Sequence, residues 1–294
     1  MALPDFLCIG AQKAGTSWLR VMLHSNPAVW MGMFKELHYF DSLYTDASRR
    51  WTSETIRSNV RFLVRRHVVR AVKQGEKVDT GRKAGQVANI DLDYLARVIK
   101  LADENYMFTE DWYRAMFDFP AGAKKIKGEI TPEYSTISAE GIQYVHKLLG
   151  PVPIIYLIRD PVGRALSHVR MKIARRKDRT EFSEDEWNAM IRREDVFVNG
   201  DYKGNVTRWM ENYPNEKLLF LPYRDVSTEP NELLAKVEKF VGIPPHKYEE
   251  AEKEVYKGAV IDIPPYVIER MRELLAEQYV FLEATFGAEF CKRI

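Results

Sequence analysis

The chain has 294 residues, of which 46% are hydrophobic and 29% are charged, so it has the composition of an ordinary globular protein and can bury a sizeable core. Its 44 basic and 42 acidic residues give a net charge of +2, a near balance that argues against a general nucleic-acid-binding protein. With two cysteines, Cys8 and Cys291, no apolar run as long as a membrane span and no secretory signal after Met1, we expect a cytoplasmic protein with no disulfide framework and no membrane partner.

Apolar segments of strand length alternate with segments of helical periodicity along the chain. Strands are predicted at residues 6–9, 126–130, 152–158 and 218–221, and helices at residues 16–24, 140–149, 231–241 and 265–286. This alternation predicts an α/β fold, a single domain over residues 1–294 in which helices flank a central parallel sheet. Residues 44–89 stay undecided, because they are helical and very basic at first and loop-like later.

The segment after the first predicted strand is typical of a phosphate-binding loop. Gly10 and Gly15 let the backbone turn back on itself, so that N–H groups of the loop and of the helix beginning near Thr16 point at one anion. A nucleoside triphosphatase P-loop has similar glycines but continues with Lys and then Ser or Thr. Here the lysine, Lys13, lies inside the loop, so the Mg²⁺-holding geometry is missing and we expect a nucleotide that needs no metal. A plain strand-to-helix turn is the alternative.

Two further motifs follow along the chain. Lys35-Glu36 stands in the segment FKELHYFD, and Arg159 and Ser167 stand at the two ends of RDPVGRALS. With Lys13-Ala14-Gly15-Thr16 before them, the chain resembles the sulfotransferases that use 3′-phosphoadenosine 5′-phosphosulfate (PAPS), most closely the branch that contains the heparan sulfate sulfotransferases. The resemblance extends over roughly residues 5–245 through Trp112-Tyr113, Gly128-Glu129, Thr131-Pro132-Glu133-Tyr134, Tyr202, Trp209, Asp225 and Pro230.

The resemblance implies transfer of a sulfuryl group from PAPS as co-substrate to an acceptor. Catalysis of such a step is mostly positioning and charge stabilisation, by analogy with phosphoryl transfer. Lys13 is expected to hold the 5′-phosphate as it becomes the leaving group, and Arg159 with Ser167 to hold the 3′-phosphate. The full set of expected cofactor-binding residues is Lys13, Ala14, Gly15, Thr16, Ser17, Lys35, Arg159, Ser167 and Lys257.

The resemblance also implies a general base. Glu36 matches the family's catalytic carboxylate, and the adjacent Lys35 favours its ionised form. His38 lies two residues beyond Glu36 and would face the same side on a strand, so it is the second candidate base, with a structural histidine as the alternative. Lys257 is the candidate to replace the basic, glycine-containing loop that many relatives place over the cofactor phosphates near the C-terminus.

The acceptor is the least determined part of the prediction. Ile130 stands where polysaccharide-acting members of the family often have a lysine, so we expect a hydroxyl on a small or carrier-borne metabolite rather than a glycan. Basic runs at residues 61–73 and 170–179 either face an anionic partner or are solvated helix faces. The sequence does not indicate the oligomeric state, and the scattered histidines predict no metal site.

Two other functions compete with an active sulfotransferase. One is a non-catalytic nucleotide-binding protein on the same fold, and the weaker one is a P-loop kinase-like enzyme. Retention of both Lys13 and Glu36 favours the sulfotransferase, because a protein that only binds a nucleotide has no need for a carboxylate facing the transferred group.

Overall fold

The computed structural model describes residues 2–44, 46–74, 76–79, 84–87, 90–118, 125–175, 182–253 and 261–294. The chain divides into two compact units. The first consists of Met1–Leu3 and Leu37–Ala121, and the second consists of Pro4–Glu36 and Gly122–Ile294. The single domain expected over residues 1–294 stays a prediction.

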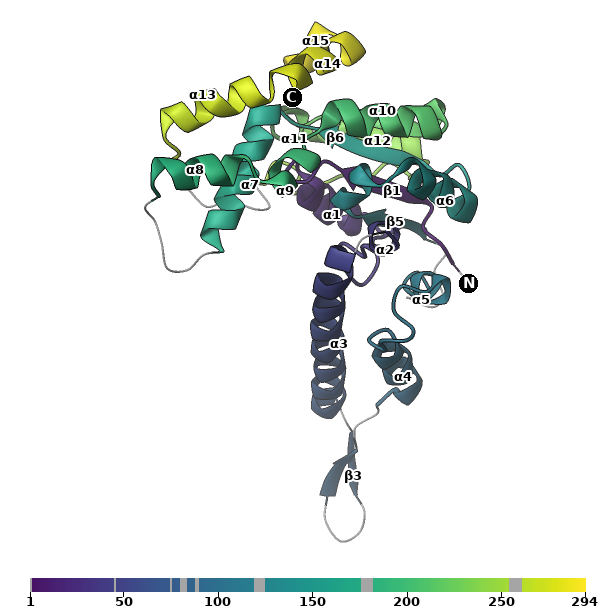
Figure 1. The fold of residues 1–294 in the computed structure, drawn as a ribbon. Helices are drawn as coiled ribbons and strands as arrows, with labels where there is room; N and C mark the ends of the chain where they lie inside the picture. Colours follow the sequence, from purple (N-terminus) through teal and green to yellow (C-terminus); the bar gives the residue numbers. More distant parts are fainter. Residues whose placement is uncertain are drawn as a thin grey trace. The chain divides into compact units, whose positions relative to one another are not determined.

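The second unit is built on a five-stranded parallel sheet with the strand order β2-β5-β1-β6-β7. Figure 1 labels β5, β1 and β6 of this sheet. The strands are β1 (Phe6–Gly10), β2 (Val29–Trp30), β5 (Ile126–Ile130), β6 (Ile154–Ile158) and β7 (Leu218–Pro222). Every residue of β1 and β6 is buried, as apolar strands covered on both faces require. The predicted central parallel sheet flanked by helices is therefore confirmed.

Helices connect the strands of this unit and cover the sheet. They are α1 (Thr16–Ser25), α6 (Ala139–Leu149), α7 (Pro161–Ala174), α8 (Glu184–Ile191), α9 (Glu194–Val198), α10 (Tyr202–Asn212), α11 (Asp225–Thr228), α12 (Pro230–Val241), α13 (Pro265–Leu274), α14 (Ala276–Phe286) and α15 (Ala288–Cys291). Short 3₁₀ helices occupy Pro132–Thr136 and Asn215–Lys217. The helix ends follow from local chemistry: the Ser138 side chain accepts from the N–H of Gly141 at the start of α6, and Gly242 takes a left-handed conformation after α12.

The long helix expected at residues 265–286 is wrong, because two helices, α13 and α14, occupy this stretch and meet at Leu275. The two halves have different main partners, although Tyr279 of α14 also contacts the start of α7. Met271 and Leu275 join a buried cluster with residues of α7 and α8. In α14, by contrast, Gln278 donates from Nε2 to Oδ1 of Asp201, the residue that caps α10, at 3.0 Å. The break lets each half follow its own packing partner.

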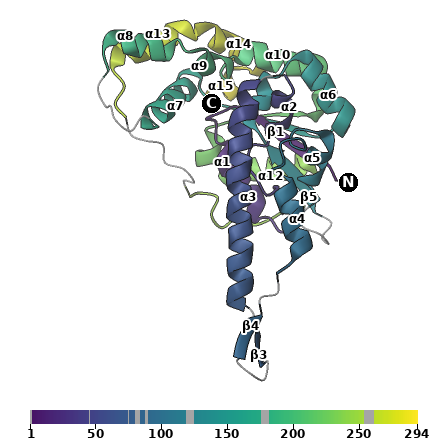
Figure 2. The ribbon, with the colours of Figure 1, turned by 60° about the horizontal axis from the view of Figure 1, so that its bottom comes forward.

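The first unit contains the region that the sequence left undecided. Its helices are α2 (Tyr39–Ser42), α3 (Asp46–Gln74), α4 (Leu92–Lys100) and α5 (Glu110–Ala115), and its strands β3 (Glu76–Asp79) and β4 (Ala84–Val87) form an antiparallel pair. Figure 2 shows α3 leading into this hairpin. The Tyr39 ring stacks on Tyr113 with ring centres 4.3 Å apart, which joins α2 to α5. Trp112 donates from Nε1 to the carbonyl of Leu101 at 2.9 Å, which joins α5 to the end of α4.

Within the described residues, no helix is long and apolar enough to cross a membrane. Even α3, with 29 residues, carries arginines along its length.

Gly128 provides a test of the packing in the sheet. A Cβ on this residue of β5 would lie 2.1 Å from Cζ of Phe6 in β1, because the Phe6 ring lies directly over the glycine. We expect Gly128→Ala to lower the free energy of unfolding by about 1–3 kcal/mol, measured by urea denaturation, since extra volume in a packed core forces neighbours to move. Combining it with Phe6→Leu, which removes the ring, should recover part of the loss. Additive losses in the double variant would contradict this packing.

Candidate functional site

The segments that follow the five strands bring functional side chains to one edge of the sheet. Because all five strands are parallel, their carboxyl ends lie at the same edge. Each strand is followed there by one candidate residue: Glu36 follows β2, Glu133 follows β5, Lys13 follows β1, Arg159 follows β6 and Tyr223 follows β7. The chain places β5 on one side of β1 and β6 on the other, and in open α/β sheets such a switch point is where ligands bind.

The loop between β1 and α1 is tightly turned. The N–H of Ala11 donates to the carbonyl of Leu157 in β6 at 2.8 Å, and the N–H of Ala14 donates to the carbonyl of Ala11 at 3.0 Å. Lys13 and Gly15 both have left-handed backbone conformations, with φ of 72° and 87°. As the N-cap of α1, Gly15 has no side chain to accept from the first-turn N–H groups, which leaves the positive end of the helix dipole for a ligand.

Gly15 is also required by a close neighbour. A Cβ at this position would lie 3.2 Å from Cε2 of Tyr223, the residue that follows β7. The loop after β1 can therefore lie close to the loop after β7 because Gly15 has no side chain.

Arg159 is held from several directions. Its Nη1 donates to the carbonyl of Lys13 at 2.8 Å, and its guanidinium lies 4.5 Å from the centre of the Tyr223 ring. Its backbone N–H donates to Oη of Tyr202 at 3.1 Å, and the same hydroxyl donates to the Arg159 carbonyl at 2.9 Å. A guanidinium fixed in this way loses little side-chain entropy when it binds an anion.

The electrostatics around Lys13 indicate a site for negative charge. Burial lowers the pKa of Lys13 below its usual value of 10.5, and the nearby cations Arg159, Arg175 and Lys35 lower it further, while Glu36 opposes the shift. Positive groups are thus so close together that each disfavours the charged form of Lys13. A bound anion would reverse this effect, which makes the loop a candidate anion site on physical grounds.

Lys35 connects the segment after β2 with the first turn of α1. Its Nζ donates to Oγ of Ser17 at 2.7 Å and to Oε1 of Glu36 at 2.6 Å. The Glu36 and Lys35 side chains are 22% and 34% exposed, so the pair is shielded but still open to a ligand. Glu36 has a left-handed backbone, with φ of 63°, which is uncommon for a residue other than glycine and is typical of functional sites.

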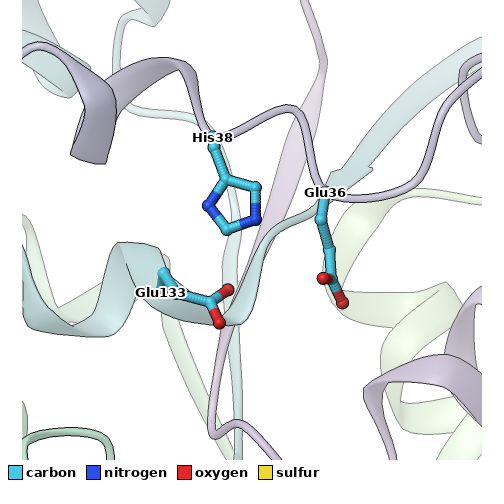
Figure 3. A group of neighbouring side chains, drawn as sticks. All are labelled: Glu36, His38 and Glu133. Carbon is cyan, nitrogen blue, oxygen red and sulfur yellow. The ribbon is translucent and has the colours of Figure 1, made fainter. Parts of the chain in front are cut away.

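A second carboxylate lies beside Glu36. Carboxylate oxygens of Glu36 and Glu133 lie within 4.8 Å of each other, and Figure 3 draws both side chains. Nε2 of Gln12, in the loop after β1, donates to Oε1 of Glu133 at 2.7 Å. Their oxygens can therefore accept hydrogen bonds from the same ligand.

The sequence interpretation did not name Glu133, Gln12 or Tyr223 as site residues. The available signal was their position, because each follows closely on the carboxyl end of a buried strand. The expected residues Lys13, Ala14, Gly15, Thr16, Ser17, Lys35, Glu36 and Arg159 all lie in segments at the same edge of the sheet. Ser167 lies inside α7, about two turns beyond its first residue, Pro161.

His38 does not lie on a strand. It is the N-cap residue of α2 with φ of 53°, and together with the left-handed Glu36 this excludes the extended backbone on which its expected orientation rested. In the first unit, His38 Nδ1 lies 2.8 Å from Oδ2 of Asp41 and its ring packs edge-on against Trp51. The extended conformation is therefore wrong, and a structural role for the ring fits these contacts. Lys257 lies outside the described residues.

Together the edge of the sheet offers cations and N–H groups for an anion, beside carboxylates able to accept a proton. Lys13, Arg159 and the start of α1 are suited to phosphate or sulfate groups. Glu36 and Glu133 are suited to removing a proton from a nucleophile. This combination fits a transfer reaction in which an anionic group moves to an oxygen or nitrogen.

Comparison with known proteins agrees with this chemistry. A model of the sulfotransferase family matches residues 4–248. Heparan sulfate glucosamine 3-O-sulfotransferase 5 of Mus musculus is 23% identical over 253 residues, which cover 83% of this chain and 54% of the relative, and the protein of the same name from Homo sapiens matches equally. The chain thus spans about half the length of the curated relatives it matches.

Solved structures show the same fold. A sulfotransferase from Alicyclobacillus acidocaldarius aligns with a TM-score of 0.60 and 19% identity, over 97% of this chain and 96% of that chain. The sulfotransferase domain from the Synechococcus PCC 7002 olefin synthase aligns with a TM-score of 0.52 and 16% identity, over 95% and 96% of the two chains. The sulfotransferase domain from the curacin biosynthetic pathway aligns with a TM-score of 0.51 and 15% identity, over 91% and 82%.

The lowered pKa of Lys13 can be tested by its reactivity. Only the neutral amine is acylated, so the rate of Lys13 acylation against pH, followed by peptide mass spectrometry, should have its midpoint below 10.5. Arg159→Gln should move this midpoint upward, because it removes a neighbouring positive charge. Arg175→Gln should give a smaller shift in the same direction, and it leaves the hydrogen bond to the Lys13 carbonyl intact. A midpoint at or above 10.5 would contradict the crowding of positive charge.

Proposed function

The chain belongs to the sulfotransferase family, and on that basis we propose that it transfers the sulfuryl group of PAPS to an acceptor hydroxyl by in-line displacement. The family and the shared fold make it a sulfotransferase enzyme. The identity of the donor, the roles of single residues and the acceptor class belong to the proposal.

The observation that carries the proposal is the hydrogen bond from Arg159 to the Lys13 carbonyl, which joins two cations at the carboxyl edge of the sheet. A nucleotide with phosphates at both its 3′ and 5′ positions presents two anions to such a pair. In the proposal, Lys13 and the N–H groups from Ala14 to Ser17 hold the 5′-phosphate. Arg159 and Ser167 hold the 3′-phosphate, which distinguishes this nucleotide from one with a single phosphate.

The transfer step follows from these roles. The acceptor oxygen attacks sulfur, the bond between sulfur and the bridging oxygen of the 5′-phosphate breaks, and that phosphate leaves with the electron pair. Lys13 and the start of α1 stabilise the negative charge that grows on the leaving group. Lys35 contacts Ser17 at the start of α1 and also Glu36. Its positive charge can therefore stabilise negative charge on the leaving group or on the Glu36 carboxylate.

Glu36 is the proposed general base. It takes the proton of the acceptor hydroxyl as the new oxygen–sulfur bond forms, so the products are a sulfate ester, 3′-phosphoadenosine 5′-phosphate and a proton. Its left-handed backbone and its contact with Lys35 hold the carboxylate at the site. Glu133, held by Gln12, is the neighbour able to bind the same acceptor or to share its proton.

The proposed acceptor is a small or carrier-borne metabolite. Ile130 in β5 is only 2% exposed, so it is apolar because it is part of the core. Its side chain therefore says little about the acceptor. The pair of carboxylates bears on the acceptor more directly, because Glu36 and Glu133 can both accept a hydrogen bond from a hydroxyl placed beside them. A neutral hydroxyl fits this environment.

The proposal is tested by incubating the protein with ³⁵S-labelled PAPS and a panel of small alcohols, phenols, acyl carriers and glycans, in the presence of a chelator. Label should move to a small or carrier-borne hydroxyl. Nucleotide binding with no transfer to any acceptor would support the non-catalytic alternative, and Mg²⁺-dependent binding of ATP would support the kinase-like one. Strong transfer to heparan-type chains alone would contradict the acceptor class.

Glu36→Gln separates catalysis from binding. The amide keeps nearly the same volume but cannot accept the proton, so kcat should fall by about 10²- to 10⁴-fold while nucleotide affinity changes little. Glu211 is an exposed carboxylate of α10, so Glu211→Gln is the matched control. It should keep both normal turnover and normal nucleotide affinity. Lys13→Ala should reduce both turnover and nucleotide affinity.

Two companion variants decide between bases. If Glu36→Gln keeps normal turnover while Glu133→Gln loses it, the base is Glu133. If only His38→Ala loses it, the base is His38. Either result overturns the role of Glu36.

A further inference from the structure

Helix α3 carries a concentration of positive charge that the proposed transfer site does not use. Among the 25 residues from Arg49 to Lys73, eight are Arg or Lys and one is Glu. The net charge of the whole chain is +2, so the remaining residues together are net negative. Such a segment attracts anionic partners over the distance of a Debye length.

One face of α3 forms a groove with the end of α4 in the first unit. The groove has a volume of about 450 Å³, and α3 contributes Arg57, Val60, Arg61, Val64 and Arg65 to its walls. Ile99 and Ala102 close the other side, and Ile99 is 54% exposed although it is apolar. The groove therefore combines an apolar floor with a rim of guanidinium groups.

Where the structure describes the chain, only one of the three arginines of this rim has a counter-ion. Arg57 pairs with Glu104 at 3.2 Å. Within the described part of the chain, no carboxylate lies within salt-bridge distance of Arg61 or Arg65. Their charges are thus open to an external partner.

The spacing of these residues matches a helix. Arg57, Arg61 and Arg65 repeat every four residues, which is about 6 Å along an α-helix. Acidic residues four apart on a second helix have the same repeat, and the apolar residues between them would meet Val60 and Val64. We propose that this groove, formed by α3 and the end of α4, docks an acidic amphipathic helix of a partner protein.

Other anionic partners fit the groove less well. A glycan or nucleic acid would contact the guanidinium groups but leave Val60, Val64 and Ile99 facing polar sugar, which gives no gain from the apolar floor. An anionic membrane requires apolar residues on one face of the helix. Phe62, at 62% exposure, lies instead on a different side of α3 from the groove.

Fluorescence anisotropy with the full-length protein tests this docking surface. The probe is a labelled helical peptide with Glu at every fourth position beside a row of Leu, and it should bind. The double variant Arg61→Gln/Arg65→Gln should weaken its binding about tenfold, as should Ile99→Asp, because each removes one part of the groove. The double variant Arg66→Gln/Arg70→Gln is the matched control, since it removes the same charge from the opposite side of α3 and should leave most of the affinity.

Several outcomes would overturn the proposal. Absence of peptide binding excludes the groove as a helix-docking site, and equal losses in both double variants show attraction by net charge alone. Vesicles with anionic lipid or heparin oligosaccharides that bind more tightly than the peptide, with the same dependence on Arg61 and Arg65, would assign the groove to those partners. Dimerisation that needs these arginines would assign it to a second copy of the chain.

The docking surface does not rest on the proposed sulfuryl transfer. Thermal unfolding followed by circular dichroism confirms that each variant is folded, and transfer to a small acceptor should be unchanged in both double variants. Loss of peptide binding in Arg61→Gln/Arg65→Gln with normal sulfuryl transfer supports the groove. If the wild-type protein transfers no sulfuryl group, that result contradicts only the proposed function.

Discussion

The hydrogen bond between the Arg159 guanidinium and the Lys13 carbonyl is the interaction on which the candidate site depends. It joins the loops after β1 and β6, two neighbouring strands whose carboxyl ends meet at the switch point of the sheet. It also brings a second positive charge toward Lys13, whose pKa is already lowered by burial. Such crowding is costly without a ligand and becomes favourable when an anion binds, so the loop pair is organised for binding negative charge before the ligand arrives.

The surrounding residues keep this arrangement in place. Tyr223 lies against the Arg159 guanidinium on one side and close to Gly15 on the other, so a single ring links the loops after β1, β6 and β7. Lys35 joins Glu36 to the start of α1. The carboxylates and the cations are therefore parts of one network, in which the nucleophile's proton and the leaving group's charge are handled by residues in contact with each other.

Much of this could be predicted from the sequence, and the reasons are physical. Apolar runs covered on both faces identified four of the strands, and the glycines around Lys13 identified the loop. β2 was missed because its two residues, Val29 and Trp30, are too few to form a pattern. The break at Leu275 depends on tertiary packing of two helix halves against different partners. The left-handed conformation of Glu36 has no local signal, because residues other than glycine rarely adopt it. Glu133 follows a predicted strand, but its closeness to Glu36 depends on the sheet order, which puts β5 next to β2.

The most direct test of a two-phosphate nucleotide site is titration calorimetry with 3′-phosphoadenosine 5′-phosphate and with AMP, both in the presence of a chelator. If Lys13 and Arg159 each hold one phosphate, the bisphosphate should bind at least tenfold more tightly than AMP, a difference of about 1.4 kcal/mol. Arg159→Ala should remove this preference, and it should also weaken AMP binding, because the Lys13 carbonyl loses its donor. Equal affinity for the two nucleotides in the wild type would contradict the account.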